Sequence, residues 1–169
     1  QVDSQIYSYY GGNSRKKFDA TEIHHRCAFA MLNEAALCLE EGIIENAEAA
    51  VTRACELTGA VINNFTAAPI YLEKSKRGGH EWIIEFKMQP SGLEEFTKIL
   101  DETLRKVNSD YDAKRAGNIA LERPLVHSVS KNTFYAWMES RGKLGGQNKV
   151  PRLSNDRKIA EGLKSFTIQ

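Results

Sequence analysis

The residues of this 169-residue chain that could do chemistry gather in one short basic stretch, residues 141–152, which reads RGKLGGQNKVPR. Two glycines, Gly145 and Gly146, leave its backbone free to change direction. Pro151 then stiffens the chain and biases the residue before it towards an extended form. Lys149 is therefore presented on a movable loop that is backed by a rigid segment. An ammonium group on a flexible side chain suits a phosphate or a developing oxyanion.

Arg152 adds a second cationic group directly after this loop. Its guanidinium can give paired donors to a carboxylate or a phosphate. The same composition is also typical of an ordinary basic surface loop, and the residues alone leave both interpretations open.

Patterns for other chemistries are weak in the sequence. His24 and Cys27 lie one helical turn apart, but two ligands do not make a zinc site, and no other metal-ligand spacing is present. We therefore predict no metal site. The sequence contains no GxSxG nucleophile pattern and neither of the glycine patterns that cradle nucleotide phosphates. The odd count of three cysteines does not indicate a disulfide framework, which favours a reducing, cytoplasmic location.

Charge is distributed unevenly along the chain. The formal net charge is only +1, so the chain as a whole is not a strongly basic or acidic binder. Residues 141–169, however, carry seven basic and two acidic side chains. This tail favours an anionic partner, or it is simply a solvated C-terminus. The aromatic residues upstream, Phe134, Tyr135 and Trp137, have the spacing of a helix core, so we predict no nucleic-acid partner.

The sequence offers no feature of a membrane protein. No stretch of about 18 apolar residues is present, and the N-terminus lacks the layout of a signal peptide. We therefore predict no membrane partner. With 41% hydrophobic residues, the chain can form a packed core.

Hydrophobic periodicity predicts the elements that must position the basic stretch. We expect helices over 23–41, 45–58, 91–116 and 132–141, and strands over 61–73, 80–88 and 125–130. The order from residue 44 onward is α-β-β-α-β-α, with an extra helix before it. This order predicts an α+β two-layer sandwich, in which helices cover a small mixed or antiparallel sheet. Trp82, Ile84 and Phe86 should share its core face, and Pro69 suits an edge strand. No regular element is predicted after residue 142.

From about residue 44 to its end, the chain resembles the C-terminal domain of the auxin-responsive acyl acid–amido synthetases of the bacterial type. The matching segments are IIENAEAAVTRACELTGA, FTAAPIYL, HEWIIEFK, NSDYDAKR and, most specific of all, SRGKLGGQNKVPRLSNDR. This family belongs to the adenylate-forming enzymes, which activate an acid with ATP to an acyl adenylate and pass the acyl group to an amine. The resemblance implies a small lid domain that swings on a large N-terminal adenylation domain.

The resemblance also implies roles for single residues. Lys149 corresponds to the lid lysine that reaches the ATP phosphates and is the predicted catalytic residue. Lys143 and Arg152 are predicted to bind phosphate or substrate. The loop or hinge positions are Gly142, Gly145, Gly146 and Pro151. Asn108, Tyr111 and Arg115 match a helix motif with a structural role. ATP and Mg²⁺ belong to the full-length enzyme, and this chain alone is expected to bind neither.

Residues 1–43 resemble a different family, the C-terminal helical domain of 3-hydroxyacyl-CoA dehydrogenase in the alpha subunit of fatty-acid oxidation complexes. The residues that carry this resemblance are VDSQIY and MLNEAALCLEEGI. The nucleotide domain and the catalytic His/Glu pair of that family are missing. The segment therefore implies no hydride chemistry, and the chain looks like a fusion of two fragments.

Three parts and two functions follow from these resemblances. Residues 1–43 form a lead-in with an amphipathic helix, residues 44–140 the α+β lid domain, and residues 141–169 its basic loop and tail. We expect the lid of an acyl acid–amido synthetase that is inactive without its adenylation domain. The alternative is a non-catalytic interaction module that docks through its N-terminal helix. Whether the chain counts as an enzyme is left open, because it holds no complete catalytic site.

Overall fold

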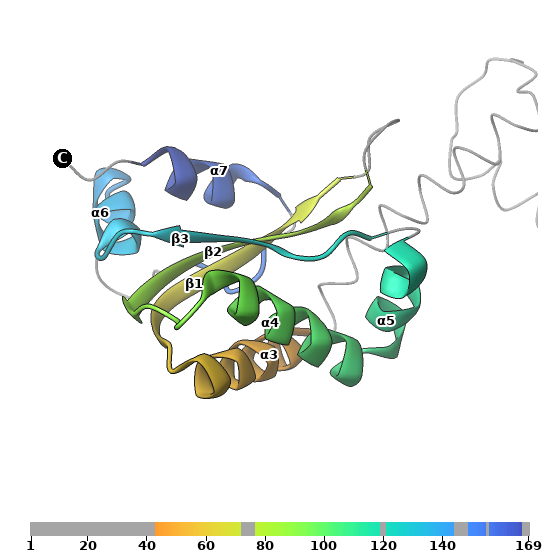
Figure 1. The fold of residues 1–169 in the computed structure, drawn as a ribbon. Helices are drawn as coiled ribbons and strands as arrows, with labels where there is room; N and C mark the ends of the chain where they lie inside the picture. The colour runs from red at the N-terminus through yellow and green to blue at the C-terminus, as the bar shows by residue number, and fades with distance from the viewer. Residues whose placement is uncertain (1–42, 72–76, 119–120, 144–148, 155, 167–169) are drawn as a thin grey trace, which may run out of the picture.

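The computed structural model describes residues 43–71, 77–118, 121–143, 149–154 and 156–166. The helix expected over 23–41 lies outside these residues. Figure 1 shows the chain as an open sheet with helices packed against it. In chain order the elements are α3 (Ile43–Thr58), β1 (Val61–Ile70), β2 (Gly79–Met88), α4 (Leu93–Val107), α5 (Ser109–Arg115), the 3-10 turn η1 (Ala116–Asn118), β3 (Leu125–Val129), α6 (Thr133–Ser140) and α7 (Lys158–Ser165).

The described strands form a three-stranded mixed sheet in the order β1-β2-β3. β1 pairs with β2 antiparallel, with Ala67 opposite Trp82, and β3 runs parallel to β2, with Val126 opposite Trp82. Because parallel neighbours need a crossover, the chain between β2 and β3 passes through α4 and α5. The predicted α+β class and element order are confirmed.

One face of the sheet forms the main core with α3 and α4 (Figure 1). Trp82, Ile84 and Phe86 all point into this core, as the two-residue period of the strand predicts. The rings of Phe86 and Phe96 pack edge to face, nearly at right angles, with their centroids 5.4 Å apart. The sheet and the layer of α3 and α4 together form the two-layer sandwich expected from the sequence.

The opposite face carries a second, smaller core under α6 and α7 (Figure 1). Ile83 of β2 and Ala68 of β1 contribute to it from the sheet, and Phe134 and Trp137 from α6. α7 is a helix that the sequence analysis does not predict. It brings this second core into contact with the basic stretch of the chain.

The long helix expected over 91–116 is in fact two helices, broken at Asn108. Asn108 has an extended backbone, and its side chain accepts a hydrogen bond from the Tyr111 N–H at 2.9 Å, so it caps α5. The break turns Tyr111 and Arg115 back towards Asp101 of α4. The Tyr111 hydroxyl donates to Asp101 at 2.6 Å, and Arg115 donates to both carboxylate oxygens. The structural role expected for these motif residues agrees with this buried network.

Asp101 keeps its charge inside this network. Burial raises the pKa of its carboxyl, but the hydrogen bonds from Arg115 and Tyr111 outweigh burial and hold that pKa below its ordinary value. The α4–α5 corner is therefore fixed by a satisfied buried ion pair rather than by apolar packing alone.

Candidate functional site

A pocket of about 270 Å³ lies between α6, the start of α7 and the segment that follows the glycine loop. Its wall is apolar in part, from Trp137, Met138, Val150 and Ile159. The other lining residues are mainly cationic: Arg141, Lys143, Lys149 and Lys158, with Pro151 and Asp156 beside them. The Arg141 guanidinium lies 4.5 Å above the Trp137 ring. The pocket combines an aromatic floor with a basic rim, which suits an anionic group.

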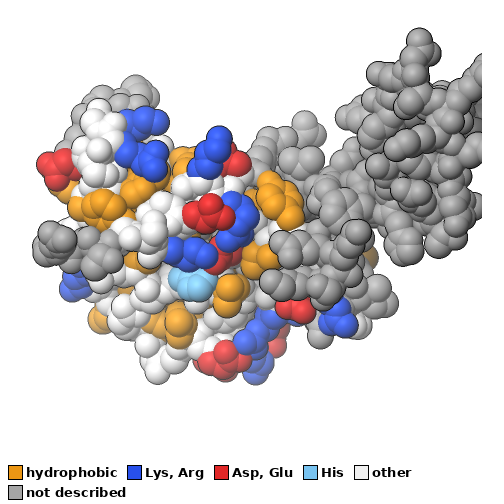
Figure 2. All heavy atoms as spheres, turned by 90° about the horizontal axis from the view of Figure 1, so that it is seen from above, with side chains coloured by type: hydrophobic (Ala, Val, Ile, Leu, Met, Phe, Trp, Pro, Cys, Tyr) orange, Lys and Arg blue, Asp and Glu red, His pale blue; other side chains and the backbone are white. Residues whose placement is uncertain are grey.

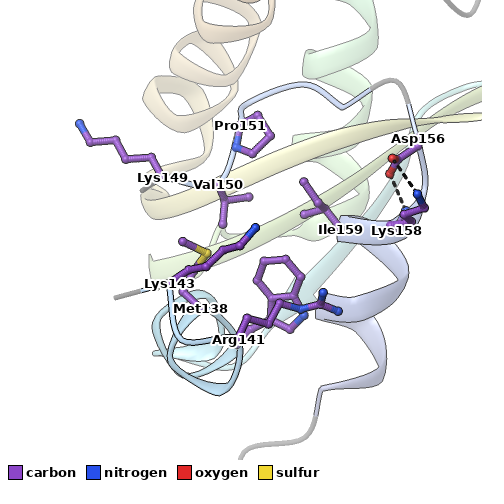
Figure 3. Close-up of a pocket in the computed structure, with 10 residues that line it drawn as sticks. Met138, Arg141, Lys143, Lys149, Val150, Pro151, Asp156, Lys158 and Ile159 are labelled. Atoms are coloured by element: carbon purple, nitrogen blue, oxygen red, sulfur yellow. Dashed lines mark hydrogen bonds and ion pairs between the residues drawn. The ribbon is translucent and has the colours of Figure 1, made fainter. Parts of the chain in front are cut away.

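The structure brings two of the predicted site residues, Lys143 and Lys149, to the same pocket. Both side chains are exposed. Figure 3 shows Lys149 directed away from the other labelled side chains. This lysine is therefore available to a group that arrives from outside the domain. Gly145 and Gly146 lie outside the described residues.

The chain enters the loop through a fixed helix end. Gly142 has a positive φ of 63°, and its N–H bonds to the Glu139 carbonyl at 2.9 Å. The Lys143 N–H bonds to the Met138 carbonyl at 3.0 Å. This pair of bonds around a left-handed glycine closes the C-terminus of α6. Gly142 thus has a defined helix-ending conformation, and the hinge role expected for it stays a prediction.

The chain leaves the loop along the outer edge of β1. The Ala67 N–H donates to the Arg152 carbonyl, and the Ser154 N–H donates to the Ala67 carbonyl, both at 2.9 Å. Along a strand, the N–H and C=O groups of successive residues point alternately to its two sides. The backbone nitrogens of Ala67 and Pro69, two residues apart, therefore both face this outer side. Pro69 has no N–H to give there, so its place on an edge strand costs no bond to β2. The edge position expected for Pro69 is confirmed.

Arg152 lies on the side of this segment that faces α3, and it does not line the pocket. Its guanidinium stacks 4.5 Å from the Phe65 ring centre and lies 3.4 Å from the Phe65 carbonyl oxygen. Glu48 of α3 lies 3.9 Å away. The phosphate-binding role expected for Arg152 stays a prediction, and in this structure its side chain packs on the domain itself.

A buried carboxylate, Glu81 of β2, positions α7 against the sheet. Lys164 donates to it at 2.5 Å, Arg157 donates to its other oxygen, and His127 Nε2 lies 2.8 Å from it. Burial raises the pKa of Glu81, but the hydrogen bonds from Lys164 and Arg157 outweigh burial and lower that pKa overall. Figure 2 shows this face, on which basic and acidic side chains surround a histidine. The network places Lys158 and Ile159, at the start of α7, in the pocket wall.

Sequence reasoning missed the pocket residues that α7 and its approach contribute, Asp156, Lys158 and Ile159. A signal was present: Ile159, Ala160, Leu163 and Phe166 recur at helical spacing, and all four belong to or pack on the second core. Arg141 was not singled out either, although its place just after the apolar positions of α6 agrees with a cation at a helix end.

Comparison with known proteins decides the family. Residues 45–158 match the GH3 family C-terminal domain, which is more than half of the chain. The chain belongs to the GH3 family.

Solved GH3 structures share this fold. The GH3.15 acyl acid amido synthetase superposes with a TM-score of 0.56 at 20% identity, over 73% of this chain and 24% of that chain. The AtGH3.15 acyl acid amido synthetase in complex with 2,4-DB gives a TM-score of 0.53 at 18% identity, over the same shares. The chain therefore spans about a quarter of those GH3 enzymes.

A short stretch of the chain is similar to a second kind of protein. Over 44 residues it is 50% identical to the fatty acid oxidation complex subunit alpha of Shewanella amazonensis, and 48% identical to that of Shewanella halifaxensis. The match covers 26% of this chain and 6% of each relative. The second resemblance expected from the sequence, to an alpha-subunit fragment, is confirmed.

Among the residues that the structure describes, no group of three His, Cys, Asp or Glu side chains could hold a metal ion. None of the helices in the described part of the chain is long and apolar enough to cross a membrane.

Proposed function

We propose that this domain is the lid of an ATP-dependent acyl acid–amido synthetase, which forms an acyl adenylate and transfers the acyl group to an amine. In this function Lys149 acts on the nucleotide phosphates when the lid closes over a large N-terminal domain. The chain alone has no turnover, because the acyl pocket and the main nucleotide site belong to that other domain. The three-part division at residues 43 and 140, and a cytoplasmic location, stay predictions of this proposal.

The observation that carries the proposal is the position of Lys149. Its side chain is exposed, it borders a pocket with three further cations, and it extends away from the other labelled side chains of that pocket (Figure 3). Membership of the GH3 family supplies the partner towards which such a residue can point.

The residues of the pocket rim fit the phosphates of ATP. Lys149 and Lys143 offer two exposed ammonium groups, and Arg141 adds positive potential beside them. As pyrophosphate leaves, negative charge develops around the α-phosphate, and the Lys149 ammonium stabilises that charge. Mg²⁺ would be held by the nucleotide phosphates and the larger domain in this proposal.

The proposal is tested by supplying the missing domain. The whole chain is mixed with the N-terminal domain of a GH3 acyl acid–amido synthetase that has lost its own C-terminal domain, and ATP–pyrophosphate exchange is measured with a set of acids. The chain is expected to change the exchange rate of that domain, and to give no exchange when it is assayed alone.

Lys149→Ala should abolish at least nine-tenths of the change that the chain produces in the pyrophosphate exchange rate of the N-terminal domain. The matched control is Lys98→Ala, an exposed lysine on α4 outside the pocket, which should act like the parent chain. If both variants act equally, or if the chain leaves the N-terminal domain unaffected, the lid function is wrong. The chain would then be better treated as an interaction module.

A further inference from the structure

Thr66 is a buried polar residue in the middle of β1, and it contacts the backbone beside the glycine loop. Its side chain is fully shielded from solvent, with 0% exposure. Its hydroxyl donates a hydrogen bond of 2.8 Å to the Pro151 carbonyl, 85 positions further along the chain. A buried hydroxyl that bonds to so distant a segment ties the two segments together.

Two backbone bonds reinforce this link. The Ala67 N–H donates one hydrogen bond to the segment that follows Pro151, and the Ala67 carbonyl accepts another from it. Ala67 also forms a parallel β-bridge with Leu153. We call Thr66, Ala67, Pro151, Arg152 and Ser154 the β1 clamp. It adds a short parallel segment to the free edge of the sheet.

Apolar contacts hold the same segment from both sides of the sheet. Val150 packs on the second core, under α6 and α7, whereas Leu153 packs on the main core with α3 and α4. Arg152 lies against the Phe65 ring at the edge of the main core. The four residues from Val150 to Leu153 are thus anchored by hydrogen bonds and by both cores. Lys149, which directly precedes them, is exposed.

We propose that Thr66 is a positioning residue for Lys149. Two residues of extended chain span no more than about 7 Å. The Cα of Lys149 therefore stays within that distance of the Cα of Pro151, whose carbonyl Thr66 holds, whatever conformation the glycine side of the loop adopts. The hydroxyl fixes the point from which the lysine reaches out. This inference rests on the proposed role of Lys149 in the lid.

The competing interpretation is that Thr66 only fills space in the core. Thr66→Val separates the two interpretations, because valine has nearly the same shape but no hydroxyl, and it favours a strand. Thr66→Ser keeps the hydroxyl and removes a methyl group. The matched control is Thr97→Val on α4, where a buried hydroxyl likewise donates to a carbonyl at 2.8 Å, that of Leu93.

Hydrogen exchange of the whole chain, followed by NMR, measures the clamp directly. In Thr66→Val the amides of Ala67 and Ser154 should exchange about tenfold faster, because the clamp opens more often. The Ser91 amide, which bonds to Thr58 elsewhere in the domain, should keep its rate. Thr66→Ser and Thr97→Val should leave the Ala67 and Ser154 rates within twofold of the parent.

The consequence for Lys149 is measured in the assay with the N-terminal domain. Thr66→Val should lower the kcat of pyrophosphate exchange about tenfold with little change in the KM for ATP, and Thr66→Ser should restore it. A loss caused only by lower stability would appear equally in Thr97→Val. If Lys149→Ala has no effect in this assay, the lid function is wrong. The hydrogen-exchange rates of the Ala67 and Ser154 amides still decide whether the clamp exists.

Unchanged exchange at Ala67 and Ser154 in Thr66→Val would overturn the inference, as would equal acceleration in Thr97→Val. Should Thr66→Val fail to fold, Arg152→Leu provides the second variant, because it removes the stacking on Phe65 while keeping an apolar side chain. It should accelerate the same two amides, and a parent-like result would count against the clamp.

Discussion

Glu85 of β2 caps the N-terminus of α6 from the middle of the sheet. Its carboxylate accepts the Phe134 N–H at 3.0 Å, and its other oxygen accepts a hydrogen bond from Asn63 of β1. The side chain is only 1% exposed. A negative charge at the start of a helix is favourable, because the free N–H groups there carry partial positive charge. One carboxylate thus fixes α6 relative to two strands, and α6 carries the entry to the glycine loop.

Glu85→Ala should lower the free energy of unfolding by about 1–3 kcal/mol, because it leaves the buried Phe134 N–H without an acceptor and removes the bond from Asn63. Glu85→Gln keeps one acceptor and should lose less. Urea unfolding followed by tryptophan fluorescence measures both variants. Exposed Glu56→Ala on α3 is the control, with an expected change of no more than about 0.5 kcal/mol. Equal losses in Glu85→Ala and Glu56→Ala would contradict the capping role.

Phe86→Ala should cost roughly 3–5 kcal/mol, since a large aromatic side chain is removed from the main core. Phe86 is 1% exposed and meets Phe96 of α4 edge to face. Met88 lies two positions further along the same strand but is 55% exposed, so Met88→Ala should cost no more than about 0.5 kcal/mol. Chemical denaturation curves give both values. A small loss for Phe86→Ala would show that this core tolerates a cavity there.

The main core is the part of the fold that sequence patterns predict well. The alternation of Trp82, Ile84 and Phe86 gave the correct face of β2, because a strand places every second residue on the same side. Pro69 was correctly expected at an edge. Both inferences depend only on local rules of strand geometry, so no knowledge of the tertiary structure was needed.

The missed features depend on contacts between distant segments. α7 has only eight residues, and its position is fixed by the bonds of Lys164 and Arg157 to Glu81, far away in the sequence. The break at Asn108 requires the geometry of a cap, which periodicity does not reveal. The bond between Thr66 and Pro151 joins residues whose types give no sign of pairing. For the candidate site, composition indicated the lysines, but the pocket around them arises from tertiary packing.

Gly162→Ala should destabilise the domain, although alanine is the better helix former. A Cβ at this position of α7 would lie 2.7 Å from Trp137 Nε1 and 3.2 Å from two ring carbons. The indole of Trp137 is buried, so either this ring or α7 must shift to make room for the added Cβ. We expect a loss of about 1–3 kcal/mol in the free energy of unfolding. Gly92→Ala is the control, because its Cβ would meet nothing closer than 4.0 Å.

Lys149→Ala should leave stability unchanged, with a melting temperature within about 2 °C of the parent. Lys149 is exposed, and in the described part of the chain no ion pair involves it. Arg157→Ala is the informative contrast, because Arg157 donates to the buried Glu81 and, at 2.8 Å, to the Pro69 carbonyl. Calorimetry should show a clear loss only for Arg157→Ala. A loss on the order of 2 kcal/mol in Lys149→Ala would place that lysine in a structural network.

His80 should make the domain less stable as the pH falls from about 7 towards 4. It is buried and stacks on Tyr111, with ring centroids 5.5 Å apart. Burial lowers its pKa to about 4, against the opposing effect of the Asp101 charge and with a smaller lowering by Lys114. In the unfolded chain its pKa is near 6.5. Between these values the unfolded chain binds a proton that the folded domain does not, so unfolding becomes easier as the pH falls.

The two pKa values set the size and the window of this effect. The destabilising effect is negligible well above pH 6.5 and grows progressively as the pH falls to 4, to a total of roughly 3 kcal/mol. Glu81 and Asp101 have lowered pKa values, so the stability that they contribute begins to be lost near their ordinary pKa values of 4.5 and 3.8 and falls further at more acidic pH. Urea unfolding at pH 7.5 and 4.5 measures the difference for the parent and for His80→Asn, which removes the titrating group. The variant should show a pH dependence smaller by this amount, and identical slopes would show that His80 takes up its proton while the domain stays folded.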